Sequence, residues 1–309
     1  MDAVLLDCTP ERRALSEDVL LADELGEAGR PQPLRERCDI GRTSAGGIGE
    51  EVSHDRSMLR RVHGSAADVW SGASYERLAE TYAPIHDRVV DALALEPGMR
   101  LLDVACGTGA VAIRAARAGA DVVGIDISAD QLDKARRAAI TEGLSIQFDE
   151  GDAQELPYAN AEFDAVASSF GAVFASDHER TAAELGRVCR RGGQLALTVW
   201  PADAWSEQHA KAGRTFSVEA DAREWSQEEH VRRLLGDAYE LDFQTGDWRI
   251  EAASGEALWE FVSTSMPPLR AWLASVDEAT REQAERVYLD FLAAGVLERR
   301  YVLVLGTRR

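Results

Sequence analysis

Hydrophobic positions from about residue 71 onward fall into two alternating patterns. Tyr75, Leu78, Tyr82 and Ile85 recur every three or four residues, which is typical of a helix with one buried face, and Pro84 predicts a kink in it. Short apolar runs bounded by turns follow, and they are typical of buried strands: 101–105, 121–126, 145–148, 163–169 and 194–200. Helical segments separate these runs, so we expect parallel βαβ units in a doubly wound α/β sheet.

The last third of the chain has a different pattern. Residues 203–236 and 254–294 are mainly helical and rich in aromatic side chains, whereas 239–250 and 301–307 resemble strands that could pair as an antiparallel edge. The helical pieces are then insertions that form a cap over the strand ends. Their aromatic side chains either build an ordinary core or wall an apolar substrate pocket, and the sequence leaves both open.

The first 69 residues show no sustained period of either kind. Pro31, Pro33 and the glycine-rich stretch 43–49 interrupt them, and only a helical turn or two around 16–25 fits the pattern. The sequence therefore predicts a poorly ordered N-terminal arm over 1–69, followed by one domain over 70–309.

Charge and cysteine content narrow the function. The 309 residues contain 34 Lys and Arg against 54 Asp and Glu, a formal net charge of −20, which disfavours binding to nucleic acid or to an anionic membrane. No apolar run approaches the roughly 18 residues of a membrane span, and no secretion signal is present, so we expect a cytoplasmic monomer or homodimer. The four cysteines lack a Cys-x-x-Cys pair, which argues against disulfides and against a metal site.

A strand, a tight turn and a helix meet at residues 101–118. The buried run that includes Leu102 and Val104 breaks into Gly107, Thr108 and Gly109 before the helical stretch begins. Glycine at both turn positions lets the backbone approach a ligand closely, and the N–H groups of the next helix point at the same place. The turn therefore predicts a nucleotide-type pocket.

Three acids lie at or near the ends of successive strands. Asp126 lies about 20 residues beyond the glycine turn, where it can accept hydrogen bonds from both ribose hydroxyls. Asp152, with the N–H of Ala153, can hold an adenine. Asp103 lies inside its strand, where a carboxylate suits an ammonium better than a pyrophosphate, and S-adenosylmethionine offers an ammonium and no phosphate. The spacing Gly107-x-Gly109 alone also fits dinucleotide dehydrogenases.

From Tyr75 to Thr307 the chain resembles the class I S-adenosylmethionine-dependent methyltransferases, in the branch that includes the ubiquinone and menaquinone biosynthesis methyltransferases. The resemblance is carried by the motifs at 102–109, 124–128, 151–157, 163–171 and 185–193. It implies a Rossmann-like, seven-stranded sheet whose last strand is antiparallel. Arg191 stands where the family usually has proline, which affects only a turn.

The strand ends and the resemblance together predict the cofactor site. We expect S-adenosylmethionine to contact residues of the strand ends, the turns after them and the preceding helix: Tyr82, Asp103, Ala105, Gly107, Gly109, Asp126, Ile127, Gln131, Asp152, Ala153, Ser169 and Phe170. Tyr75 is a further candidate for closing over the methionine end, and Val173 for flanking the adenine or the methyl group.

Three histidines are candidates for a catalytic base. His86 lies on the helix that should cover the cofactor, His209 in the first cap helix, and His178 at the start of a helix as the third choice. Packing or capping is the alternative role for each. A Gly-x-Ser-x-Gly elbow and a histidine pair at i, i+4 are both absent, so serine hydrolase and zinc chemistries find no support.

The predicted function is methyl transfer from S-adenosylmethionine to a small molecule that is apolar or aromatic. Two alternatives stay open. One keeps the fold and the cofactor but catalyses a cyclisation or rearrangement, because fold alone does not fix function. The other is an NAD-dependent oxidoreductase.

Overall fold

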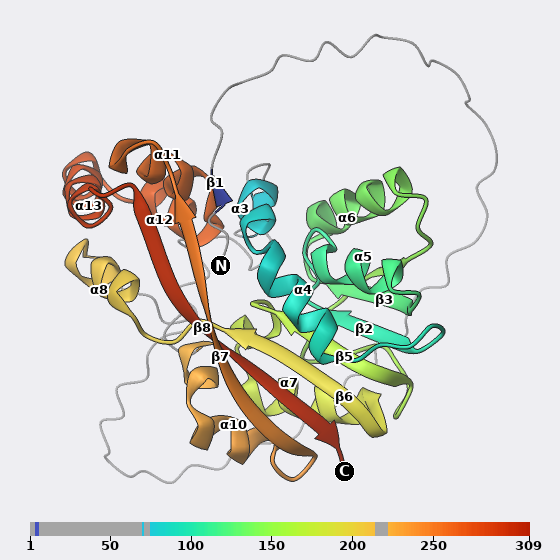
Figure 1. Cartoon of the computed structure of the whole chain (residues 1–309). Coiled ribbons are helices and arrows are strands. Elements are labelled where there is room, and N and C mark those ends of the chain that lie inside the picture. Colours follow the sequence, from blue (N-terminus) through green and yellow to red (C-terminus); the bar gives the residue numbers. More distant parts are fainter. Residues whose placement is uncertain (1–3, 6–69, 71–74, 214–221) are drawn as a thin grey trace, which may run out of the picture. The chain divides into compact units, whose positions relative to one another are not determined.

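The computed structural model of the chain describes residues 4–5, 70, 75–213 and 222–309 (Figure 1). The helical turn expected around 16–25, and most of the predicted arm, lie outside the described residues. Within the arm, Val4–Leu5 forms a short strand, β1, whose residues pair in parallel with Ile250 and Glu251.

One mixed sheet organises the described chain. Its strand order is β1-β7-β8-β6-β5-β2-β3-β4. The strands beyond β1 are β2 (Arg100–Val104), β3 (Asp121–Asp126), β4 (Gln147–Glu150), β5 (Phe163–Ser169), β6 (Cys189–Val199), β7 (Tyr239–Glu251) and β8 (Val296–Arg308). Strands β2 to β6 pair in parallel, and β8 runs antiparallel to both of its neighbours. The predicted seven-stranded sheet with an antiparallel last strand is confirmed, with β1 as a two-residue addition.

The antiparallel pair expected at one edge of the sheet is present. It consists of β7 and β8, and β8 is the inner strand of the pair, between β6 and β7. Leu303 and Val304 are adjacent and point to opposite faces, and both are buried. A strand covered on both faces and on both sides belongs in the interior of the sheet.

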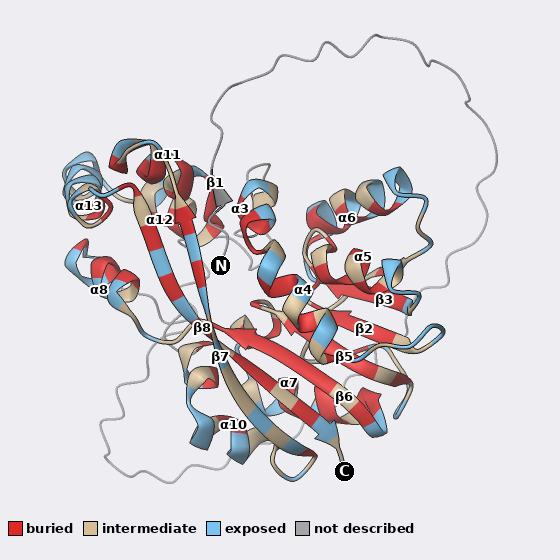
Figure 2. Ribbon diagram, in the orientation of Figure 1, coloured by how far each residue is buried: buried red, intermediate tan, exposed pale blue. Residues whose placement is uncertain are grey.

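Helices cover both faces of the sheet (Figure 2). The expected first helix is broken near Pro84 into α3 (Tyr75–Thr81) and α4 (Ala83–Ala92). On one face α4 packs beside α5 (Ala110–Arg117) and α6 (Ala129–Thr141), and on the other face lies α7 (His178–Val188). The alternation of the strands produces this division: Leu101 belongs to the first of two core clusters and Leu102 to the second.

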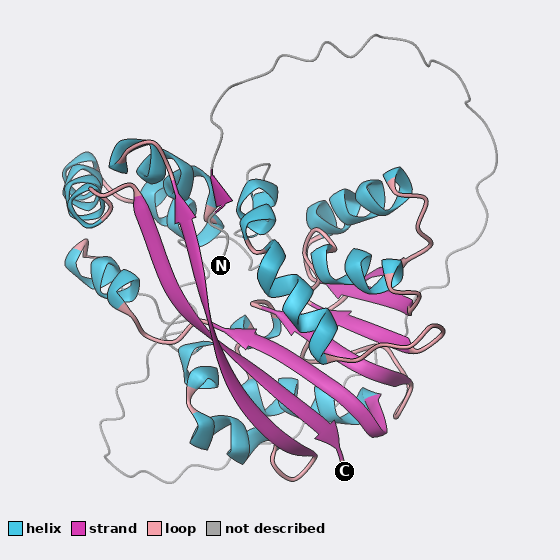
Figure 3. Cartoon of the chain, viewed as in Figure 1, coloured by secondary structure: helices cyan, strands magenta, loops and turns pink. Residues whose placement is uncertain are grey.

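The cap prediction needs one correction. Within 203–236, α10 (Glu228–Leu235) is not part of a cap but packs on α7 and β7, because its Val231 and Leu235 are buried in the second core. Four other helices surround the projecting ends of β7 and β8 (Figures 1 and 3): α8 (Ala204–Lys211), α11 (Gly255–Ser265), α12 (Pro267–Ser275) and α13 (Glu278–Phe291). None of the described helices is long and apolar enough to cross a membrane.

Gly246 of β7 pairs with Tyr301 of β8 and is closely surrounded by side chains. A Cβ added there would overlap the ring of Tyr301, which is buried, and would lie 2.5 Å from Nη1 of Arg88. The same Arg88 nitrogen donates to the carbonyl of Thr245 at 3.0 Å and to the Tyr301 hydroxyl at 3.2 Å. Because glycine has no Cβ, Tyr301 of β8 and Arg88 of α4 can pack against β7 at this position.

We predict that Gly246→Ala lowers the free energy of unfolding by about 1–3 kcal/mol, because the added methyl must displace Tyr301 or Arg88. Urea denaturation measures the change. The control is Thr245→Ala, at the neighbouring exposed position, which should alter stability by less than about 0.5 kcal/mol. Equal effects of the two substitutions would contradict the packing argument.

Candidate active site

The turn after β2 is bent by three residues with positive φ. Ala105 has φ 55°, Gly107 53° and Gly109 80°. Gly109 is the N-cap of α5, so this bend aims the first turn of the helix at the strand end. A non-glycine residue in this conformation is strained, and at Ala105 the strain lies directly beside the turn.

Asp126 fastens this turn to the neighbouring strand. Its Oδ2 accepts a hydrogen bond from the N–H of Gly107 at 2.8 Å, and its Oδ1 accepts from the N–H of Ser128 at 2.9 Å. Each oxygen has a second lone pair, so the carboxylate keeps the capacity to accept from a ligand hydroxyl. Burial raises the pKa of Asp126, and the backbone N–H groups partly offset this effect.

A small cavity of about 310 Å³ lies against the turn. Ala105, Gly107, Asp103, His86 and Ser169 are among its lining residues. It therefore brings together four residues predicted to bind the cofactor and one predicted base.

Asp103 is the buried acid of this cavity. Only 1% of its surface is exposed, and its Oδ2 accepts from the N–H of Ala112 at 3.0 Å. Burial raises its pKa to about 8, and Asp126 adds to the rise. A positively charged group in the cavity would favour the ionised form of Asp103 and lower this pKa.

His86 occupies the same small cavity. Burial lowers its pKa to about 3, with the nearby charge of Arg114 acting in the same direction, so the ring is neutral at pH 7. Its Nδ1 is buried, and the described residues provide no hydrogen-bond partner for it. A histidine in this state is a weak proton acceptor, and its unpaired nitrogen is suited to contacting a ligand.

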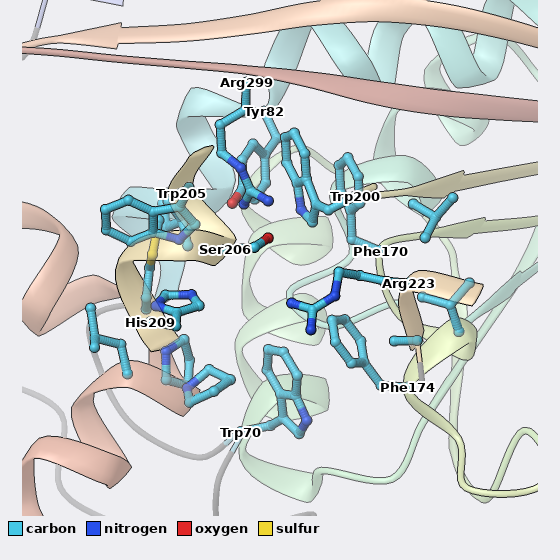
Figure 4. Close-up of a pocket in the computed structure, with 18 of the residues that line it drawn as sticks. Trp70, Tyr82, Phe170, Phe174, Trp200, Trp205, Ser206, His209, Arg223 and Arg299 are labelled. Carbon is cyan, nitrogen blue, oxygen red and sulfur yellow. The ribbon is translucent and has the colours of Figure 1, made fainter. Parts of the chain in front are cut away.

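Figure 4 shows a second, larger cavity. Its empty volume is about 830 Å³, part of it open to solvent, and its walls are largely aromatic: Trp70, Tyr75, Tyr82, Phe170, Phe174, Trp200 and Trp205. Phe170 and Trp200 are stacked, with ring centroids 4.3 Å apart and planes within 3° of parallel. His209, Arg223 and Arg299 supply polar groups.

The two cavities are neighbours in the structure. Tyr75 lines both of them. Ser169 lines the small cavity and the next residue, Phe170, lines the large one, with φ of 55° at Phe170 turning the chain between them. Burial raises the pKa of Tyr75, as do the charges of Asp126 and Asp103, so its hydroxyl stays protonated at neutral pH.

Several predicted cofactor residues are not among those that line the small cavity. Asp152 accepts through Oδ1 from the backbone N–H of Gln154 at 2.9 Å, and Ala153 follows it in the chain. Ile127, beside Asp126, is 41% exposed, which is unusual for a large apolar side chain. Gln131 is buried and donates through Nε2 to the carbonyl of Trp70 at 2.6 Å. Gly109 acts as the cap of α5 described above.

The other two histidine candidates differ in their position relative to the cavities. His209 lines the large cavity, and its Nδ1 contacts the hydroxyl of Tyr288. His178 lines neither cavity. Its Nδ1 lies 3.2 Å from Nε2 of His230, at a junction of α7 with α10.

Sequence reasoning missed most of the large cavity's polar groups. Arg299 and Arg223 were not predicted. Trp200 directly follows β6, so its position at a strand end was a usable signal. Neither arginine lies in a local motif, and only the folded chain brings them together.

With this geometry established, comparison with known proteins identifies the class. A profile described as a methyltransferase domain matches residues 101–193. The chain belongs to the class I S-adenosylmethionine-dependent methyltransferases, as its fold and motifs predicted.

Individual relatives cover different shares of the chain. An uncharacterized protein of Mycobacterium tuberculosis, Rv1405c, is 32% identical over 256 residues, which is 78% of this chain and 93% of that protein. The demethylmenaquinone methyltransferase of Deinococcus radiodurans is 43% identical over 116 residues, 37% of this chain and 48% of that enzyme. The chain thus matches less than half of that enzyme's length.

A solved structure shows the same fold. BH2331 of Bacillus halodurans, a proposed methyltransferase, superposes with a TM-score of 0.52 at 17% sequence identity, covering 72% of this chain and 97% of that one.

The raised pKa of Asp103 predicts a pH-dependent stability. The carboxyl titrates at 3.8 ordinarily and at about 8 in the folded protein, so the folded state holds a proton that the unfolded chain releases. Stability should therefore fall as pH rises from about 4 to about 8. The side chain of Asn does not titrate, so Asp103→Asn should not lose stability in this way as pH rises. Its amide oxygen can still accept the hydrogen bond from the N–H of Ala112.

Urea denaturation at pH 5, 6.5 and 8 tests this. We expect the advantage of Asp103→Asn over the unmodified protein to grow by at least about 1 kcal/mol between pH 5 and pH 8. Asp133→Asn, whose side chain is 62% exposed, is the control and should show no growth. If the difference in free energy of unfolding between Asp103→Asn and the unmodified protein is the same at all three pH values, the raised pKa of Asp103 is contradicted.

Proposed function

We propose that the protein transfers a methyl group from S-adenosylmethionine to a small, planar and largely apolar acceptor. The observation that carries this proposal is the pair of cavities that share Tyr75, one at the glycine turn and one walled by aromatic rings. A methyl donor and its acceptor need adjacent sites with a common boundary, because the transfer is an in-line displacement.

The small cavity suits the amino-acid end of the cofactor. Asp103 places a buried carboxylate where an ammonium would be stabilised, and Nδ1 of His86 is a buried polar atom available to a ligand. At Gly107 the missing Cβ leaves space, since an added one would lie 3.6 Å from the Tyr75 ring. We expect Asp126 to accept the ribose hydroxyls, and the exposed Ile127 to cover the adenine beside Asp152 and Ala153.

Bound S-adenosylmethionine would supply a methyl group already activated by a sulfonium. The chain's own residues then need to exclude water and fix the acceptor on the transfer axis. Tyr75 and Tyr82 line the boundary side of the large cavity, and the stacked Phe170 and Trp200 offer a flat wall for a planar molecule.

His209 is the better-placed proton acceptor. It lines the acceptor cavity, whereas His86 lies in the cofactor cavity with a pKa of about 3. The Tyr288 hydroxyl holds the ring of His209 through Nδ1. We therefore assign removal of an acceptor proton to His209, and cofactor contact to His86.

Two measurements separate this function from the alternatives. Isothermal titration should give binding of S-adenosylhomocysteine and none of NAD, and mass spectrometry of the product should show one added methyl. Tight binding of NAD alone would favour an oxidoreductase. A product without added mass would favour a cyclase that uses the same fold.

Asp126→Ala should weaken binding of S-adenosylhomocysteine by about 1–3 kcal/mol, because one or two charge-assisted hydrogen bonds to the ribose are lost. Isothermal titration measures the change, and circular dichroism checks that the turn held by Asp126 still folds. The control is Asp121→Ala at the start of the same strand, where the side chain is 67% exposed. Unchanged affinity in Asp126→Ala would mean that the ribose binds elsewhere.

His209→Gln should lower kcat by about 100-fold for an acceptor that loses a proton, while affinity for S-adenosylhomocysteine stays unchanged. A radiolabelled methyl donor with a panel of phenols, quinones and polyketides provides the assay. His178→Gln, outside both cavities, is the control. If His209→Gln keeps full activity, His209 is not the catalytic base.

A further inference from the structure

The large cavity carries positive charge that an apolar acceptor alone does not explain. Arg223 and Arg299 are among its lining residues, and no Asp or Glu is among the described residues that line it. Figure 4 shows both guanidinium groups reaching into the space between the aromatic rings. The whole chain has a formal charge of −20, so a local excess of positive charge here runs against the overall balance.

The charge of Arg299 is already matched. Its Nε donates to Oδ2 of Asp203 at 2.7 Å, and both side chains are largely buried. Its guanidinium carbon lies 4.3 Å from the centre of the Trp200 ring, which stacks in turn on Phe170. Arg299 therefore completes a three-layer stack and leaves little net charge for a ligand.

The charge of Arg223 is not matched within the described part of the chain. This half-buried residue begins η2 (Arg223–Ser226), and its carbonyl accepts from the Ser226 hydroxyl at 2.7 Å. Its guanidinium forms no ion pair or hydrogen bond with any described residue. The adjacent Glu224 faces away, with Oε2 3.5 Å from Nδ1 of His230.

We propose that the acceptor is an aryl carboxylate, whose anionic group binds Arg223 while its ring system lies among the aromatic walls. This assignment of the acceptor rests on the proposed methyl-transfer function. A guanidinium beside aromatic rings has lost part of its hydration, and a planar carboxylate restores two parallel charge-assisted hydrogen bonds. Anchoring the anion at η2 leaves the rest of the molecule to extend toward Tyr75, where the two cavities meet.

Matched pairs of acids and primary amides test the proposal: benzoate and benzamide, 2-naphthoate and 2-naphthamide, and biphenyl-4-carboxylate and its amide. Binding to the full chain is measured by isothermal titration at pH 7.5 with saturating S-adenosylhomocysteine. We expect at least one acid to bind about tenfold more tightly than its amide, because only the acid pairs with the guanidinium.

Variants locate the source of that preference. Arg223→Gln should abolish it, and Arg223→Lys should keep a reduced part, because lysine retains the charge without the planar fork. Arg286→Gln is the control, at a side chain that is 70% exposed on α13. Thermal denaturation of each variant confirms folding.

The possible outcomes distinguish this inference from the proposed function. Amides that bind as well as their acids, no binding by any acid, or a preference that survives in Arg223→Gln would each overturn the inference. Binding of S-adenosylhomocysteine to the unmodified protein is recorded separately. Its absence would overturn the proposed function, whereas its presence without an acid preference would overturn only the assignment of the acceptor.

Discussion

The hydrogen bond from the N–H of Gly107 to Oδ2 of Asp126, 2.8 Å long, joins the turn after β2 to the end of β3. Because those two strands are paired in parallel, the bond fixes the first turn of α5 relative to the carboxyl edge of the sheet. The positive φ of Ala105 and Gly107 can persist because this bond and the buried strands determine the local path of the chain. The small cavity depends on that path.

The structure divides polarity between the two cavities. The small one contains a buried carboxyl, Asp103, whose protonated form is favoured until a positive partner arrives. The large one contains aromatic rings and arginines, and the residues that line it within 75–213 and 222–309 include no carboxylate. In the proposed function, a cationic donor and an anionic acceptor would each lie on the side of Tyr75 whose charge suits it. Among the helices around the far ends of β7 and β8, α8 and α12 contribute residues that line the second cavity.

Local patterns predicted the features that depend on neighbouring residues. Buried runs gave the strands, the glycines gave the turn, and the side chain of Ser128, within the motif 124–128, caps α6 by accepting from the N–H of Gln131. Features that depend on distant contacts were not predictable in the same way. The insertion of β8 inside the sheet and the packing of α10 on α7 are set by tertiary burial. Arg223 and Arg299 meet only because η2 and β8 reach the same cavity.

The most direct test of this account is a crystal structure of the protein with S-adenosylhomocysteine. We expect the amino-acid end of the ligand to lie beside Asp103 and Gly107 and its ribose to contact Asp126. The sulfur should face Tyr75, which lines both cavities. Density for the ligand in the aromatic cavity, or at any place away from the Gly107 turn, would contradict the account.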